Sequence, residues 1–373
     1  MNKLKWFTLI GGLVIGVIAV ILVKLGNPGN MGFCIACFER DIAGALGLHR
    51  AGVVQYIRPE IIGLILGAMI FALFKGEFRS RGGSATFLRF IMGAFMMIGA
   101  LVFLGCPLRD ILRMAGGDVN AVVAFIGFAL GIATGVFFLK RGFDLGRSTN
   151  HDHQLGGFVL PAIFAFLLVL LLCATSFSEG GPIFFSQSGP GSMAAPVAIS
   201  LIAGLLVGAI AQRIRLCLSG GIRDFILMRD NTLLLGFLGI FAGALVLNLI
   251  FGFFNFGFTI GGGAKPQPVA HTAQLWNFLG LYLVGLTACL LGGCPLRQLV
   301  LSGEGDTDAA AVVVGMIVGA AFAHNFAFAS AASAINAETA LLSIGGPGLY
   351  GQIACVVGIV FMLIVGFTHR EKA

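Results

Sequence analysis

Apolar stretches long enough to cross a lipid bilayer dominate this chain of 373 residues. A helix needs about 20 consecutive apolar residues to span the hydrocarbon core. About ten stretches approach that length, at 6–25, 57–74, 84–104, 118–139, 157–175, 195–212, 232–254, 273–292, 308–329 and 348–368. Only 10% of the residues are charged, whereas an average soluble domain has about 25%. The sequence therefore predicts an all-α polytopic membrane protein with about ten membrane spans.

Four apolar pieces between these stretches are too short to cross a bilayer, and they lie near 31–48, 105–116, 213–229 and 293–303. Interrupted backbone is tolerated at membrane depth only where it is buried in protein or lines a cavity. We therefore expect four short re-entrant half-helices. The 56 glycines of the chain suit both interrupted helices and closely packed spans.

A five-residue sequence, Gly-Cys-Pro-Leu-Arg, occurs twice, at 105–109 and 293–297. A second element also recurs, because Cys34 and Cys217 each stand six residues before an Arg-Asp dipeptide. Similarity at a nearly constant offset indicates an internal duplication. Each copy then contains two elements in which an arginine follows a cysteine, and all four lie in the expected half-helices.

The duplication predicts the domain organisation. We expect repeat one at 1–143, with four spans, and repeat two at 195–330. Residues 144–194 would form a cytoplasmic linker, a connecting span and an outer loop, and 331–373 the final span and a cytoplasmic tail. Five spans precede the second copy, so that copy is expected to be inverted in the membrane. Inverted repeats with broken helices are a common plan among secondary transporters.

Lysine and arginine in the connecting loops predict the orientation, because cytoplasmic loops carry an excess of them. The loops at 176–194 and 330–347 contain neither residue, so we expect them outside. Both termini are then cytoplasmic. The expected cytoplasmic face would contain Lys3, Lys5, Lys75, Arg79, Arg81, Lys140, Arg141, Arg147, Arg213, Arg215, Arg370 and Lys372. These loops account for the net charge of +7 without a nucleic-acid partner.

The cysteines of the half-helices are the candidate transport residues, and they are Cys34, Cys37, Cys106, Cys217 and Cys294. Proline follows two of them directly, which favours a helix start at that point. A helix amino end carries about half a positive charge, which favours an anion. Sulfur is soft, its S–H group is a weak donor, and its thiolate attacks sulfur or selenium. We therefore expect a chalcogen anion as cargo, bound by S–H donors or captured transiently by covalent transfer.

Charged residues follow these cysteines, and two roles are open for them: anion support or structural ion pairs. They are Arg40, Asp41, Arg109, Asp110, Arg223, Asp224 and Arg297. Buried arginines in a membrane are costly and are usually paired or functional. Adjacent residues point in different directions on a helix, so we expect each of the first three arginines to pair with an acid of a neighbouring half-helix. In the fourth element Gln298 replaces the acid, which makes Arg297 the best candidate for holding an anion near the inner side.

These motifs resemble the YeeE/YedE family of sulphur transport membrane proteins over essentially the whole chain. The segments 31–49 and 55–60 are most similar to the YedE branch, to which selenium transport is assigned. The resemblance implies a bacterial inner-membrane protein with half-helices that bring cysteines to a central pathway. It also implies thiosulfate uptake, with cargo handed to a small cytoplasmic sulfur-carrier protein. The family's pathway cysteines would fall on Cys34, Cys106 and Cys294, and Cys217 matches the equivalent half-helix.

Cys37 departs from the duplicated pattern, because copy two has Gly220 at the matching position. The resulting Cys34-x2-Cys37 pair has no second ligand pair nearby, so we expect no metal and no other cofactor. A membrane thiol-disulfide oxidoreductase that uses these two cysteines is the alternative function. The outer loops at 176–194 and 330–347 contain no cysteine to support it. We therefore expect a transporter and not an enzyme.

Overall fold

The computed structural model describes residues 3–173, 183–260, 265–336 and 341–369. The longer helices coincide with the ten predicted spans and are α1 (Lys3–Lys24), α3 (Pro59–Phe74), α4 (Thr86–Phe103), α6 (Val119–Lys140), α7 (Leu155–Cys173), α8 (Val197–Arg213), α10 (Thr232–Ile250), α11 (Gln274–Leu291), α13 (Thr307–Asn325) and α14 (Leu349–Thr368). Within the described residues, nine helical segments are long and apolar enough to cross a membrane, and α3 is shorter at 16 residues. The prediction of an all-α polytopic membrane protein is confirmed.

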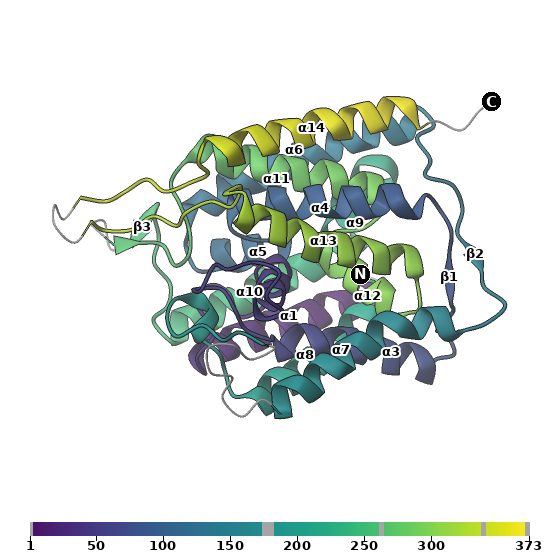
Figure 1. Ribbon diagram of the computed structural model, residues 1–373, viewed down its shortest axis with the longest axis horizontal. Helices are drawn as coiled ribbons and strands as arrows, with labels where there is room; N and C mark the ends of the chain where they lie inside the picture. The colour runs from purple at the N-terminus through teal and green to yellow at the C-terminus, as the bar shows by residue number, and fades with distance from the viewer. Residues whose placement is uncertain (1–2, 174–182, 261–264, 337–340, 370–373) are drawn as a thin grey trace.

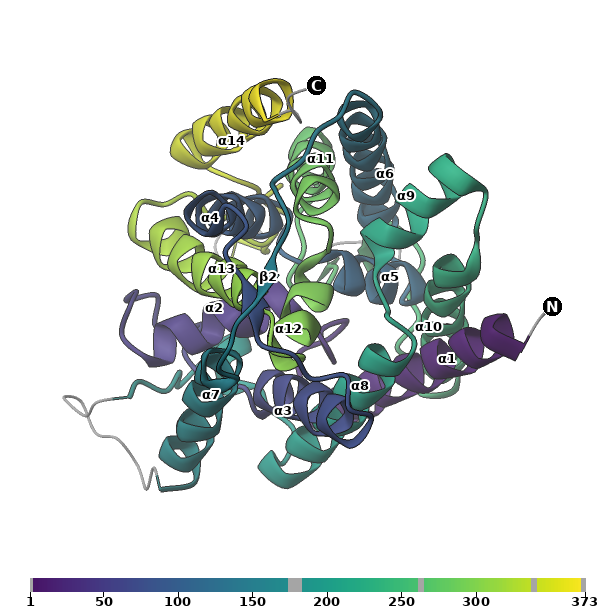
Figure 2. The same cartoon turned by 90° about the vertical axis from the view of Figure 1, so that its right-hand side faces the viewer.

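Four short helices lie inside the predicted half-helix ranges, and they are α2 (Ile35–Ala45), α5 (Pro107–Ala115), α9 (Leu218–Met228) and α12 (Pro295–Gly303). The long helices form two groups, with α4, α6, α11, α13 and α14 in one and α1, α3, α7, α8 and α10 in the other (Figure 2). Each short helix contacts members of both groups. The four therefore connect the two halves of the structure, while their depth in a bilayer stays a prediction.

The long helices pack in pairs that are equivalent when the two copies are exchanged. Helix α1 packs along α10 and α3 along α8, while α4 packs along α13 and α6 along α11. We match α1 to α6 in order with α8 to α13. The pair α1–α10 then corresponds to the pair α8–α3, and the pair α4–α13 corresponds to α11–α6. The short helices follow the same rule, since α5 contacts α10 and α6 while α12 contacts α3 and α13. The predicted repeat boundaries and the inversion are still predictions.

Glycine allows these pairs to approach closely. A Cβ added to Gly12 of α1 would lie 1.8 Å from the carbonyl oxygen of Gly236 in α10. A Cβ on Gly67 of α3 would lie 2.2 Å from the carbonyl oxygen of Leu205 in α8. No side chain fits at such distances, so backbone packs directly on backbone, as is usual for small residues between membrane helices.

Two small antiparallel pairs of strands lie at opposite ends of the molecule (Figure 1). Strand β1 (Arg81–Gly82) pairs with β2 (Thr149–Asn150), and β3 (Thr259–Ile260) pairs with β4 (Lys265–Pro266). A single turn of 3₁₀ helix, η1 (Pro190–Ser192), precedes α8. The carboxyl end of α14 lies at the β1–β2 end (Figure 1).

Candidate functional site

Three predicted cysteines gather where α2 and α5 begin. Cys34 is the N-cap of α2, and its Sγ accepts a hydrogen bond from the backbone N–H of Cys37 at 3.4 Å. Its thiol also interacts with those of Cys37 and Cys106, and Cys106 is the N-cap of α5. The Cys37 thiol donates to the carbonyl oxygen of Leu104 at 3.8 Å. All three thiols are buried, and we call them the first thiol cluster.

The second copy builds a matching pair of thiols. Cys217 is the N-cap of α9 and Cys294 the N-cap of α12, and their Sγ atoms are 3.9 Å apart. The Cys217 Sγ accepts the backbone N–H of Gly220 at 3.2 Å, as Cys34 accepts that of Cys37. The Ser219 hydroxyl lies 3.2 Å from the same sulfur. We call Cys217 and Cys294 the second thiol cluster.

The local sequence explains why each cysteine stands at a helix start. An N-cap side chain satisfies an amide that the helix leaves free, and sulfur can act as a weak acceptor for it. Pro107 and Pro295 occupy the first helical position, where proline loses no hydrogen bond. The helix dipoles of two half-helices therefore point toward each cluster. A shared path through both clusters is still a prediction.

Arg109 lies close enough to the first thiol cluster to interact electrostatically with Cys34 and Cys37. Its buried guanidinium donates to the carbonyl oxygens of Leu104, Asn30 (3.3 Å) and Pro268 (3.0 Å). It pairs with no carboxylate among the described residues, so the expected pairing with an acid of another half-helix is wrong. Carbonyl oxygens of nearby segments satisfy its donors instead.

The acid beside Arg109 forms no ion pair among the described residues either. Both carboxylate oxygens of Asp110 are buried and have no hydrogen-bond partner among the described residues, and the same holds for Glu39 of α2. The sequence pattern singled out Asp110 as an ion-pair partner, which the structure does not show. Glu39 was not predicted as a site residue, although it stands five residues after Cys34.

Two arginines pair with the adjacent aspartate, contrary to expectation. Arg40 contacts Asp41 at 2.7 Å, and Arg223 contacts Asp224 at 2.9 Å. The arginine side chain is long and flexible, so its guanidinium reaches the adjacent carboxylate even though the two Cα–Cβ bonds diverge. Asp41 also binds Arg58 at 2.7 Å, and sequence reasoning missed this residue. Arg58 lies at the N-cap of α3, and only the fold brings it to α2.

Arg297 is compensated as well. Its guanidinium contacts the carboxylate of Glu304 at 3.0 Å. The acid stands seven residues later, at the C-cap of α12, so two helical turns bring it back to the same face. Gln298 was expected to leave Arg297 with less obvious compensation, and Glu304 supplies that compensation instead. A further buried pair, Arg113 with Asp118 at 2.7 Å, was missed too.

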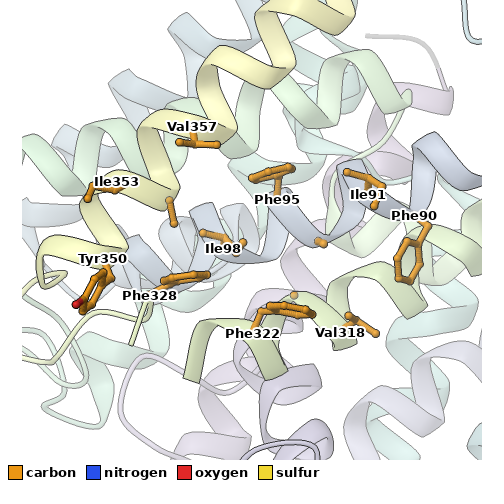
Figure 3. Close-up of a pocket in the computed structure, with 13 residues that line it drawn as sticks. Phe90, Ile91, Phe95, Ile98, Val318, Phe322, Phe328, Tyr350, Ile353 and Val357 are labelled. Carbon is orange, nitrogen blue, oxygen red and sulfur yellow. The ribbon is translucent and has the colours of Figure 1, made fainter. Parts of the chain in front are cut away.

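An apolar hollow of about 510 Å³ lies away from these charges, between α4, α13 and α14 (Figure 3). Phe95, Phe328, Tyr350 and Val357 line it together with other apolar residues, and no charged side chain takes part. Three candidate spans form its walls. Because its lining contains no charged side chain to bind an anion, the thiol clusters are the better candidate site.

Comparison with known proteins adds one finding. The family described as Sulphur transport matches residues 2–108 and 213–373. The matched ranges contain all the cysteines of both thiol clusters. No curated protein matches the chain.

Proposed function

The chain belongs to the Sulphur transport family, and from this premise we propose that it carries a small sulfur- or selenium-containing anion through a path that both thiol clusters line. The observation that supports this most directly is the placement of four N-cap cysteines in two clusters. Each cluster combines S–H donors with the amino ends of two half-helices. Arg109 adds a positive charge beside the first cluster and forms no ion pair with a carboxylate among the described residues.

The thiols can act on this cargo in two ways. As neutral groups they donate S–H hydrogen bonds to a terminal sulfur or selenium atom. As a thiolate, one of them can attack the terminal sulfur of thiosulfate, which forms a persulfide while the sulfur–sulfur bond of the anion breaks and sulfite leaves. We favour hydrogen bonding, because two thiolates in a cluster would repel a doubly charged anion. Thiosulfate has the terminal sulfur that both modes need, whereas selenite presents only oxygen atoms to the S–H donors.

We propose further that the protein lies in the bacterial inner membrane with both termini in the cytoplasm. A small cytoplasmic sulfur-carrier protein would then receive the cargo. The alternative, a thiol-disulfide oxidoreductase, would exchange disulfides with a partner protein, whose cysteine would have to reach Cys34 or Cys37. Both residues are fully buried, which favours the transport function.

Uptake by cells without their own importers tests the proposal. Radiolabelled thiosulfate and selenite are supplied to cells that express the intact protein, Cys106→Ala or Cys294→Ala at matched membrane levels. We expect uptake of at least one anion by the intact protein and background uptake by both variants, because each removes a thiol from one cluster. Cys173→Ala is the matched control, since Cys173 is exposed at the end of α7 and belongs to neither cluster.

The opposite results are equally clear. If the intact protein takes up neither anion, or if uptake is indifferent to both cluster cysteines, the path lined by thiols is wrong. Loss of uptake in Cys173→Ala to the same degree would mean that the effect of the cluster variants is not specific.

A further inference from the structure

A charged cavity of about 370 Å³ opens at the β1–β2 end of the molecule. It is lined by Gly76, Glu77, Arg79, Arg81, Arg215, Arg297 and Glu304. These residues come from the segment after α3, from β1, from the connection between α8 and α9, and from α12. Figure 2 faces this end and shows α12 beside α3 and α8. We call this cavity the arginine vestibule.

The charges of the vestibule do not cancel. Glu304 is shared between Arg297, at 3.0 Å, and Arg81, at 3.6 Å. Glu77 accepts a hydrogen bond from the side-chain amide of Gln212 at 2.7 Å and forms no ion pair within the described ranges. Arg81 also pairs with Asp306 at 2.9 Å. Four guanidinium groups of the lining are therefore balanced by three carboxylates, and one positive charge is left over.

Two of these guanidinium groups are open to a ligand. Across the described parts of the chain, neither Arg79 nor Arg215 has a side-chain hydrogen bond or an ion pair, and both side chains are exposed. Arginine presents a planar set of donors that matches the oxygen atoms of a sulfate-like group and can bind two of them at once. A cavity with two such groups free is suited to a small oxyanion.

Two residues that line the vestibule are close in the sequence to the cysteines of the second thiol cluster. Arg215 stands two residues before Cys217, and Arg297 stands three residues after Cys294. The sulfurs of Cys217 and Cys294 are 3.9 Å apart. Of the residues that line the cavity, Arg215 lies just before α9 and Arg297 lies in the first turn of α12. The sulfurs are buried whereas the cavity is open. An anion that moves between this cluster and the solvent at the β1–β2 end would meet these arginines.

The backbone at Arg215 supplies an independent observation. Its φ angle is +51°, just after the end of α8, and Leu216 donates its backbone N–H to Ala211 at 2.9 Å. Helices often end this way, with glycine in the left-handed position. A residue with a Cβ costs about 1–2 kcal/mol in that conformation. Arg215 keeps this conformation although glycine would adopt it more easily, and its side chain lines the vestibule.

We propose that the arginine vestibule binds a small doubly charged oxyanion, with Arg79 and Arg215 as its main contacts and Arg297 assisting. For the identity of the natural ligand this rests on the proposed function, because the anion next to the second thiol cluster would be the cargo. Binding itself needs only the tetrahedral oxyanion group. Sulfate has that group but no terminal sulfur to transfer, so it probes the vestibule without thiol chemistry.

The test measures equilibrium binding of radiolabelled sulfate to the purified full-length protein in detergent, together with its melting temperature. We expect saturable binding by the intact protein and at least a tenfold loss of affinity in Arg215→Gly. The same variant should melt at a higher temperature without sulfate, because glycine relieves the strained position. Weaker binding in a more stable protein cannot result from misfolding.

Arg229→Gly is the matched control. Arg229 has a φ angle of +58° at the end of α9 and lies outside the vestibule. This substitution should raise the melting temperature in the same way but leave sulfate affinity unchanged. Sulfate also stabilises proteins in general by exclusion from their surface, and all variants share that effect.

The outcomes separate this proposal from the transport proposal. Equal sulfate affinity in the intact protein and in Arg215→Gly would overturn the proposal that the vestibule binds an oxyanion. An equal loss of sulfate affinity in Arg229→Gly would overturn it too. Cys294→Ala should bind sulfate normally even where it has lost uptake. A protein that transports but binds no sulfate would refute the vestibule alone, whereas binding that depends on Arg215 would support it even if uptake fails.

Discussion

Two Arg-Asp dipeptides with the same place in their half-helices lie in different surroundings. The side chains of Arg40 and Asp41 are 3% and 0% exposed, whereas those of Arg223 and Asp224 are 29% and 17% exposed. Asp41 also neutralises Arg58, whose remaining donors bind the carbonyl oxygens of Met193 and Pro190. At the residue scale, one carboxylate therefore connects α2 to the start of α3 and to the segment before α8.

Asp41→Asn should destabilise the protein strongly. The substitution leaves two buried guanidinium groups without a counter-charge, and breaking a buried ion pair costs about 3–5 kcal/mol. We expect a clear fall in the melting temperature of the purified protein. Asp224→Asn is the matched control, and its effect should be much smaller because water reaches that pair. Equal losses in the two variants would show that burial does not decide the strength of these pairs.

The glycine contacts belong to the scale of the helices. Helices α1 and α10 approach until a Cβ on Gly12 would lie 1.8 Å from a backbone oxygen. The neighbouring Gly11 differs, because its Cβ would meet only the side chains of Ile210 and Ile214, at 3.1 Å and 3.2 Å. Flexible side chains can move by a few tenths of an ångström, whereas the backbone of a packed helix cannot.

Gly12→Ala should therefore force α1 and α10 apart and lower the melting temperature. Gly11→Ala makes the same chemical change one residue earlier in the same helix, with the same gain of about 1 kcal/mol in helix preference. We expect this control to leave the melting temperature unchanged or slightly raised. A similar response of the two variants would argue against close backbone packing between these helices.

Over the whole molecule, the two thiol clusters have equivalent positions but different surroundings. The first has three cysteines and Arg109, while the second has two cysteines, Ser219 and the open vestibule beside it. Helices that are distant in the chain build each cluster, since 77 residues separate Cys217 from Cys294. If the cargo passes through both clusters, a covalent link between the two half-helices of one cluster should therefore stop its transport.

A mild thiol oxidant should form a disulfide between Cys217 and Cys294, whose sulfurs are close enough to join after a small rotation. Mass spectrometry of alkylated peptides would identify the link. We expect uptake of the labelled anion to fall as the link forms and to return after reduction. The Cys217→Ser variant should form no such disulfide and should keep its uptake unchanged by the oxidant. Full uptake by the cross-linked protein would contradict a path through the second cluster.

The sequence by itself determined the helices of this protein and the starts of its half-helices. These depend on local properties, namely the length of an apolar run, a proline in the first turn and a cysteine that can cap it. The family, too, was recognisable from the duplicated motifs, and the family match bears it out. Neighbouring residues contain this information, so no fold is needed to read it.

Only the tertiary structure decided which groups meet. It placed the thiol of Cys34 beside that of Cys106 and the thiol of Cys217 beside that of Cys294. It also gave Arg109 carbonyl partners and brought Glu304 to Arg297. It also assembled the vestibule from four separate segments. The physical reason is that the partner of a buried charge depends on how several helices pack, and spacing along one helix does not contain that information.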